Sequence, residues 1–512
     1  MSRRINRRRF LAEASCGAMS ATTLINSMVN LGAINGATTG NSANFGVGSD
    51  YKALVCLLLQ GGCDTFNVLI PMGMDASAGG DNGYLKYSET RSDLAIPLNQ
   101  VLPLNPLSTT SNGLTSRYDA YGLHPGMPEI QNLFNTGACS FISNIGTLVE
   151  PLADYNDYYG GVKKLPLGVY SHSDQVMQWQ SSVPQSRDAL GFGGRVADLL
   201  HAQNDFDAIS MNISLAGSNT FQTGHQVVEY AVSDNLSPDN VGFESIKPWW
   251  YSNTGFLTQT RNNAIDNLVS QTYANLLKQQ YSSLTKTSIE SFELFKEALK
   301  KVPSFTTVFP NTGLADDLFA IAKLISVQAE LGAKRQIFFV QYGGWDNHDD
   351  LIQAQAQRLP VVSQALNAFY NATVELGIQD KVTTFTISDF ARTATSNGQG
   401  SDHAWGGNHI VMGGAVDGQR IFGGYPSMDI NNPAESPLNV SFRGNFIPSI
   451  STDQFYAELA LWYGVSVNDL CYVLPNLGNF YSYSNGVYPI GFMDFSGTSI
   501  CTNPAQESCL VY

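Results

Sequence analysis

Charged residues are scarce in this chain of 512 residues, and basic residues are the scarcer kind. Asp, Glu, Lys and Arg together make up 14% of the sequence, well below the roughly 25% of an average soluble domain. The 28 basic residues are outnumbered by 43 acidic ones, so the formal net charge at pH 7 is -15. Nucleic acids and anionic lipid surfaces both require clustered Lys and Arg. We therefore expect no nucleic-acid partner and no electrostatic attachment to a membrane.

The N-terminus carries a candidate export signal. Arg7 and Arg8 lie just ahead of Phe10, as in a twin-arginine motif, and a weakly apolar run continues to Ala33. That run is too short and too polar for a membrane span. We interpret residues 1–45 as a twin-arginine signal peptide with its linker, so the twin-arginine translocase is an expected partner during export. The mature protein is then periplasmic, cell-surface or extracellular.

Cysteine is also sparse, with seven in the chain, and six lie beyond the signal. An even number in an exported protein permits disulfides. Cys501 and Cys509 lie close together in a tail at 481–512 that is rich in small polar residues, and we expect these two to pair. Cys56 lies within an apolar run, where a free thiol packs as a small hydrophobic group.

Apolar runs alternate with helix-periodic segments between residues 50 and 480. The short continuous runs are typical of strands buried on both faces, and they occur at 51–59, 335–340 and 381–387. Apolar residues at helical spacing indicate helices over 262–302, 315–331, 351–376 and 452–463. This alternation predicts an α/β fold with a central, mostly parallel sheet and helices on both faces.

The domain boundaries follow from the same pattern. We expect one domain over 50–480, with a helical insertion around 217–335 and a separate tail after it. Residues 73–120 show no long periodicity and are expected to form loops.

Aspartate and histidine are concentrated at the ends of the predicted strands. Asp346 and His348 follow one strand after two glycines, and Asp64 follows another in the same way. Open α/β sheets place their chemistry at the carboxyl ends of strands, so we expect these residues to converge with a second group consisting of Asp402, His403 and His409. Any one of them alone is better explained by a helix cap or a hydrogen bond to a loop amide. As a set they suit a divalent cation such as Zn²⁺, Mn²⁺, Mg²⁺ or Ca²⁺.

Three further residues are candidates for the site, and two of them have two interpretations each. Ser171 precedes a predicted helix, where it is either a plain N-cap or a nucleophile at the positive end of that helix. Arg392 follows the strand at 381–387 and either binds an anionic substrate or forms a structural salt bridge. Asp389 is suited to orient a metal-binding histidine from behind.

Several segments resemble a bacterial family called domain of unknown function 1501, whose members are exported by the twin-arginine route. The matching segments run along nearly the whole mature chain: Leu58 to Asp64, Ser171-His172-Ser173, Gly343 to His348, Ser388 to Thr393, Ser401 to Gly406, Trp462 to Val465 and Leu474 to Leu477. That family is placed in the alkaline phosphatase-like superfamily, which includes sulfatases and phosphodiesterases. The resemblance implies an alkaline phosphatase-like fold with two metal ions.

The same resemblance implies a division of the ligands. Asp64, Asp402 and His403 would hold one metal together with the nucleophile. Asp346 and His348 would hold the other, completed by a further histidine or amide, for which His409 and Asn408 are available.

The leading expectation is an exported, metal-dependent hydrolase of phosphate or sulfate esters, acting on a small molecule or a polymer. Ser171 or an activated water would attack, and Arg392 would stabilise the developing charge. The alternative is a non-catalytic exported protein that keeps the fold for binding or for assembly with a surface partner.

Overall fold

The computed structural model describes residues 51–74, 82–107, 110–111, 114–115, 117–205, 209–234, 236–237, 260, 264, 267–268, 270–483 and 487–495. The signal interpreted at residues 1–45 and the disulfide expected between Cys501 and Cys509 lie outside these residues. Cys56, Cys63 and Cys139 are described, and all three are buried free thiols.

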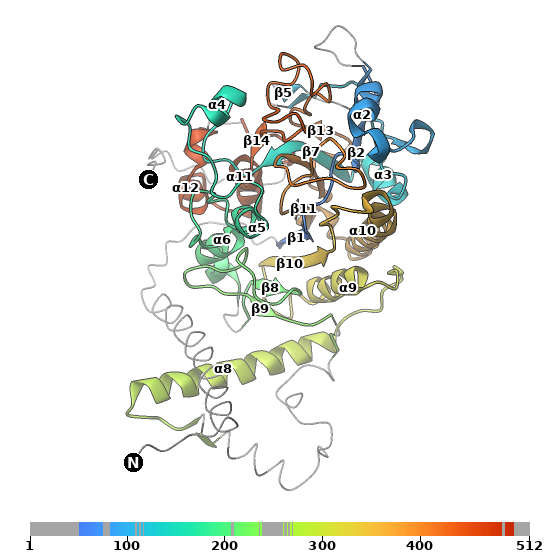
Figure 1. The fold of residues 1–512 in the computed structure, drawn as a ribbon. Coiled ribbons are helices and arrows are strands. Elements are labelled where there is room, and N and C mark those ends of the chain that lie inside the picture. Colours follow the sequence, from blue (N-terminus) through green and yellow to red (C-terminus); the bar gives the residue numbers. More distant parts are fainter. Residues whose placement is uncertain are drawn as a thin grey trace, which may run out of the picture.

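A nine-stranded sheet forms the centre of the molecule (Figure 1). Its strands run in the order β13-β7-β12-β11-β1-β10-β8-β9, and β14 also pairs with β7. Six of the eight pairings are parallel, and β12 is antiparallel to both of its neighbours. The strand bounds are β1 Lys52–Gln60, β7 Cys139–Gly146, β8 Asn212–Ser214, β9 Tyr230–Ala231, β10 Arg335–Gly343, β11 Val382–Ser388, β12 Gly407–Met412, β13 Ile421–Phe422 and β14 Ile450–Ser451.

Helices cover both faces of this sheet (Figure 1). Alternate residues of β1 show why: Val55 and Leu57 belong to one hydrophobic cluster, and Leu54 and Leu58 belong to another. The first cluster includes apolar side chains of α3 (Pro128–Asn135), α9 (Gly313–Ser326) and α10 (Leu351–Glu375), and the second includes those of α5 (His172–Ser181), α6 (Phe192–Leu200), α11 (Thr452–Tyr463) and α12 (Leu470–Val473). The predicted α/β fold, with a mostly parallel sheet and helices on both faces, is confirmed.

The smaller elements lie around this body. They are the helices α2 (Gly83–Arg91), α4 (Tyr155–Tyr159) and α8 (Leu276–Leu299), the sheet of β2 (Leu69–Pro71), β6 (Tyr121–Leu123) and β3 (Leu102–Pro103), and the pair β4 (Thr110–Ser111) and β5 (Leu114–Thr115). The helical insertion expected around 217–335 stays a prediction.

The segment at 73–120 was expected to form loops, and helix α2 corrects this. Its buried positions are Gly83, Tyr87 and Arg91, which recur every four residues as one face of a helix requires. Only one of the three is a large apolar residue, so the hydrophobic period is hidden in the sequence. The helix begins where the Asn82 side chain accepts a hydrogen bond from the backbone of Leu85.

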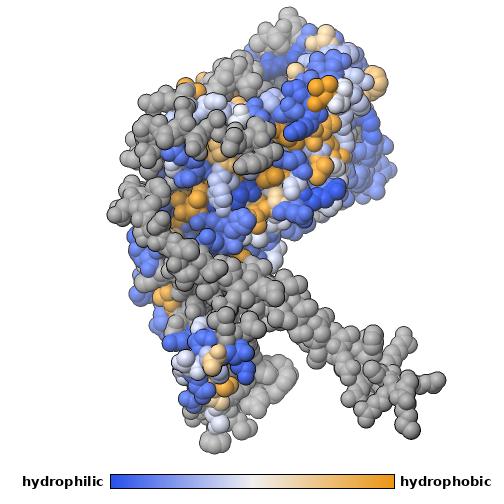
Figure 2. All heavy atoms as spheres, turned by 90° about the vertical axis from the view of Figure 1, so that its left-hand side faces the viewer, coloured by the Kyte–Doolittle hydropathy of each residue, from blue (hydrophilic) through white to orange (hydrophobic). Residues whose placement is uncertain are grey.

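On the face drawn in Figure 2, hydrophobic side chains are interspersed with hydrophilic ones. Within the described part of the chain, none of the helices combines the length and the apolar character needed to cross a bilayer.

Candidate metal centre

Three strands of the sheet end at the same place and start the loops that build the site. β1 leads into Gly61-Gly62, β10 leads into Trp345 and Asp346, and β11 leads into Asp389. Gly61 lies so close to the β10 loop that a Cβ atom there would fall 2.6 Å from the backbone nitrogen of Asp346. The two loops can approach only because this residue carries no side chain.

Three imidazoles and one carboxylate converge at this edge. The atoms concerned are Nε2 of His172, His348 and His403 and Oδ1 of Asp346. Five distances between these atoms are 3.0 Å (His348–His403), 3.1 Å (His172–His403), 3.1 Å (His348–Asp346), 3.6 Å (His172–Asp346) and 3.7 Å (His403–Asp346). Ligand atoms of His172, Asp346 and His403 all lie within 4.8 Å of one another, as a shared metal ion requires.

Each of the three imidazoles is held from behind through Nδ1. The partner is Asp389 Oδ2 for His172 (2.7 Å), the carbonyl oxygen of Tyr170 for His403 (2.8 Å) and a carboxylate oxygen of Asp402 for His348 (3.2 Å). Carbonyl and carboxylate oxygens only accept, so Nδ1 carries the proton in every case. In the neutral form each ring then directs the lone pair of Nε2 into the cluster, where that of His348 also faces Arg392 Nη1 at 3.4 Å. This is the arrangement in which proteins orient metal-binding histidines.

The protonation states also suit a cation. Partial burial alone raises the pKa of Asp346, but the hydrogen bond and charge of Arg392 outweigh it, so the pKa of this carboxyl lies below its usual value. Burial lowers the pKa of His403, assisted by the positive charge of Arg392. At neutral pH the cluster therefore presents an ionised carboxylate beside a neutral imidazole.

Arg392 is a positioning group for this cluster. Its side chain is fully buried, and it donates to the carbonyl oxygens of Gly61, Gly62, Trp345 and Ser401 as well as to Asp346. Its Nη1 also lies 3.4 Å from His348 Nε2. Since its five N–H groups are occupied by protein atoms, it has none left for a substrate. Of its two readings from the sequence, the structural salt bridge is the one that this geometry supports.

An antiparallel β-bridge places His403 beside Arg392. The ring of Phe390 packs against His172 at 4.6 Å and against His403 at 4.5 Å between ring centroids, so two of the imidazoles share one aromatic support.

Asp402 contacts the cluster through His348 and does not belong to it. Besides His348, its carboxylate pairs with Arg443 and accepts a hydrogen bond from Asn397 at 3.2 Å. The structure thus gives it the role of orienting His348, whereas the sequence predicted a direct ligand.

Asp64 does not join the cluster, although it was expected to. Its side chain is 1% exposed and forms an ion pair with Arg91, whose side chain is fully buried. Its other oxygen accepts a hydrogen bond from the backbone of Phe66 at 3.2 Å. The carboxylate is therefore neutralised by a guanidinium from α2.

His409 is also separate from the cluster. It is buried in β12, with its ring against Trp179 at 4.8 Å between centroids and Nδ1 at 3.4 Å from the Thr386 hydroxyl. Neighbouring Asn408 is occupied as well, because its amide bonds Ser143 and Thr65. With Asp64 and His409 engaged elsewhere, the expected second metal site does not assemble among the described residues.

Ser171 is the N-cap residue of α5 and directly precedes His172. Its hydroxyl lies 3.1 Å from the hydroxyl of Ser173 and makes no described bond to the cluster. His172 itself was part of a motif noted in the sequence but was not named as a ligand. The signal that pointed to it was the adjacent Ser-His pair at the start of a helix.

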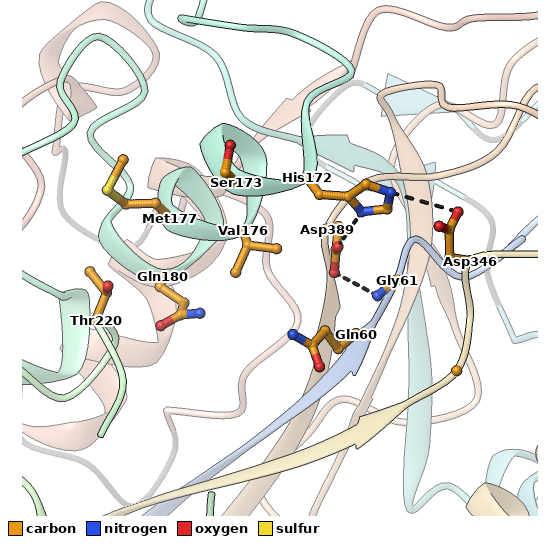
Figure 3. Close-up of a pocket in the computed structure, with 11 residues that line it drawn as sticks. Gln60, Gly61, His172, Ser173, Val176, Met177, Gln180, Thr220, Asp346 and Asp389 are labelled. Atoms are coloured by element: carbon orange, nitrogen blue, oxygen red, sulfur yellow. Dashed lines mark hydrogen bonds and ion pairs between the residues drawn. The ribbon is translucent and has the colours of Figure 1, made fainter. Parts of the chain in front are cut away.

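A cavity of about 700 Å³ opens beside the cluster and is lined by residues of β1, of α5 and of the loop that follows β10 (Figure 3). His172 and Asp346 form one end of it, and Asp389 lies beneath them. The four converging side chains are between 26% and 50% exposed, so solvent and small molecules reach them.

The residues present fit a metal ion. Ligands of a tetrahedral ion at about 2.0–2.1 Å would lie roughly 3.3–3.4 Å apart, and the separations within the group of His172, Asp346 and His403 are 3.1, 3.6 and 3.7 Å. Two imidazoles with one carboxylate form a donor set suited to zinc, manganese or iron rather than to calcium, which prefers oxygen ligands.

The comparisons with solved structures give weak likenesses. The crystal structure of Ps i-CgsB in complex with k-i-k-neocarrahexaose has 10% identity and a TM-score of 0.30, over 83% of this chain and 72% of that chain. The lipoteichoic acid synthase LtaP from Listeria monocytogenes has 8% identity and a TM-score of 0.28, over 82% and 80%. The PsFucS1 sulfatase from Pseudoalteromonas sp. has 11% and 0.27, over 74% and 66%. TM-scores this low say nothing about the chemistry of this chain.

Curated proteins include no match to the sequence. A family model does match, over residues 51–441, which is most of the chain. The chain belongs to the family described as protein of unknown function (DUF1501).

Proposed function

We propose that this protein is an exported, metal-dependent hydrolase of phosphate or sulfate esters. The observation that carries the proposal is the convergence of His172 Nε2, His403 Nε2 and Asp346 Oδ1, with the Nδ1–H of both histidines already bound. A bound cation would stabilise two imidazole lone pairs and a carboxylate held at this spacing. His172, Asp346 and His403 would hold the ion, and His348 lies beside them with its Nε2 3.1 Å from Asp346.

A divalent cation at this place supplies Lewis-acid charge to the oxygen atoms of a bound ester. Asp389 keeps the Nδ1 proton of His172 in place and so keeps Nε2 free for coordination. Arg392 holds Asp346 at the rim of the cavity, through which an ester would reach the cluster.

We propose Ser171 as the attacking group. It adjoins His172 at the N-terminus of α5, where the helix dipole favours a developing negative charge. To attack, its hydroxyl must leave Ser173 and turn toward the cluster, because Ser171 does not line the cavity in this structure. A Ser171→Ala variant with turnover reduced roughly 10³-fold supports this role, and undiminished turnover assigns the attack to water instead.

Export is part of the same proposal, supported by the Arg7-Arg8 pair. A variant with Lys at both positions should stay in the cytoplasmic fraction, whereas the unaltered chain should appear in the periplasm, on the surface or in the medium. Equal fractionation of the two would contradict the twin-arginine interpretation.

The central test combines metal analysis with turnover. The purified chain should contain about one divalent ion per molecule, and it should hydrolyse generic aryl phosphate or aryl sulfate esters. Treatment with a chelator should remove both properties, and re-addition of the metal should restore them. Asp349→Ala, which changes an exposed acid in the same loop, is the matched control and should alter neither property.

The rival is a non-catalytic protein with a structural metal ion. Arg392 has no donor left for an anion, and the described lining of the cavity contains neither Lys nor Arg. A metal-loaded protein without turnover of any phosphate or sulfate ester would favour this rival.

A further inference from the structure

The cavity beside the metal centre has a chemical character of its own. One wall is a single face of α5, formed by Ser173, Val176, Met177 and Gln180, which are spaced at i, i+3, i+4 and i+7. The same helix supplies His172 at its first turn, so the cavity is continuous with the cluster (Figure 3). The opposite wall is the end of β1, with Gln60.

Gln180 points an unused donor into this space. Its side chain is 6% exposed, and Oε1 accepts a hydrogen bond from the backbone nitrogen of Phe221 at 2.9 Å. A backbone N–H only donates, so the bonded atom is the oxygen and Nε2 lies on the cavity side. Nε2 makes no hydrogen bond to the described residues and is open to the cavity, so it can donate to an occupant.

Gln60 offers a second amide donor from the opposite wall. Its Oε1 accepts a hydrogen bond from the Gln341 side chain, which leaves Nε2 available. Figure 3 shows the amide nitrogens of Gln60 and Gln180 facing each other across the cavity. The space is thus flanked by two N–H donors with fixed orientation.

The remaining lining limits what fits there. Ser173 and Thr220 add hydroxyl groups, and Val176 and Met177 add an apolar strip. No Lys or Arg belongs to the described lining, and the acidic members, Asp346 and Asp389, are already bound at the cluster. A charged occupant would therefore find no ion-pair partner away from the metal.

From this lining we infer that the cavity is a leaving-group subsite for an uncharged, oxygen-rich group, a sugar or polyol. Its oxygen atoms accept hydrogen bonds from Gln60 and Gln180, and its C–H face lies on Val176 and Met177. The inference rests on the proposed function for its kinetic test, because the ester bond would be broken between this group and the phosphate or sulfate at the metal centre.

The kinetic test uses metal-loaded, full-length protein and three phosphate esters: glucose 6-phosphate, phosphocholine and 3-phosphoglycerate. We expect kcat/KM for the sugar ester to exceed both others at least ~10-fold, as two or more neutral hydrogen bonds imply. Equal rates for the three, or preference for a charged leaving group, would overturn the subsite.

The variants assign the preference to the two amides. Gln180→Glu keeps an acceptor for Phe221 but replaces the donor with a carboxylate, so kcat/KM for glucose 6-phosphate should fall roughly 10-fold or more, while that for p-nitrophenyl phosphate changes less than about 3-fold. Gln60→Glu, at an exposed position where folding is not at risk, should act in the same direction. Gln185 lies outside the cavity, so Gln185→Glu serves as the control.

A binding test separates this inference from the hydrolase. Saturation-transfer NMR with glucose and sorbitol should show contact with the metal-loaded protein and a weaker signal in Gln60→Glu. Sugar binding without any ester turnover leaves the subsite intact and removes the proposed function. Turnover without sugar contact, or contact that is equal in the variant, removes the subsite and leaves the function.

Discussion

Asp64 and Asp346 follow the same local sequence pattern and end in different states. Each comes after a buried strand and two glycines, and each contacts a fully buried arginine. The Asp64 side chain is 1% exposed, and among the described residues its partners are Arg91 and the backbone N–H of Phe66. Asp346 is 50% exposed and meets three imidazoles on its open side. A carboxylate at a strand end becomes a candidate metal ligand only under two conditions. Other ligand atoms must lie near it, and the arginine that pairs with it must leave part of the carboxylate accessible.

The largest expected effect comes from Asp346, the exposed carboxylate of this pair. Asp346→Ala combined with His403→Ala should remove the metal and lower the turnover of aryl esters roughly 10³-fold or more, equivalent to about 4 kcal/mol. Metal content by mass spectrometry and initial rates measure the two effects. Retention of a full complement of metal would show that the cluster is not the metal site.

Replacing Asp64, the buried carboxylate of this pair, should change stability and leave metal content unchanged. Asp64→Asn leaves Arg91 buried without its counter-charge, so the free energy of unfolding should fall by about 3–5 kcal/mol. Metal content should stay the same when it is measured at a temperature where the variant is folded. Denaturant unfolding gives the first quantity. Metal loss from a folded Asp64→Asn protein would restore Asp64 as a ligand.

The residue behind the cluster sharpens the comparison further. Asp389→Asn removes the carboxylate that orients His172 and should weaken metal binding by about 10–100-fold. Competition with a chromogenic chelator measures the change in affinity. Asp174→Asn is the control, since that acid pairs with Arg187 away from the cluster. Equal affinities in all three proteins would mean that the tautomer of His172 does not matter.

The strands and the open part of the site could be predicted because the local sequence encodes them. Continuous apolar runs determined β1, β10 and β11, and the turns after them put Asp346 and His348 at the right edge. The fate of Asp64 could not be predicted in that way. It depends on Arg91, which lies 27 residues further on in a helix without a hydrophobic period.

His409 and His172 show the same limit for imidazoles. The sequence placed His409 beside the Asp402-His403 pair, yet an antiparallel strand carries it into the core beside Trp179. His172 reaches the cluster from a helix more than 170 residues before Asp346, so only the folded chain brings them together. Composition and spacing along the chain do not contain such long-range pairings.

The last prediction tests whether His409 is a core residue. Burial lowers the pKa of His409 to about 3, compared with about 6.5 in the unfolded chain. Above pH 6.5 both states are neutral, so the stability due to the neutral ring is fully present there. As pH falls below 6.5, His409 becomes protonated in the unfolded state but stays neutral in the folded state. The free energy of unfolding should then fall by about 1.4 kcal/mol per pH unit until pH 3 is approached.

Removing the titrating group at position 409 should therefore flatten the acid limb of the stability profile. His409→Leu should lose less stability than the unaltered protein between pH 6 and pH 4, as measured by urea unfolding at each pH. His225→Leu, at an exposed histidine, should leave the slope unchanged. If His409→Leu keeps the original slope but lowers metal content, His409 belongs with Asp346. A flatter slope with full metal content would show that His409, like Asp64, is a buried structural residue and not a metal ligand.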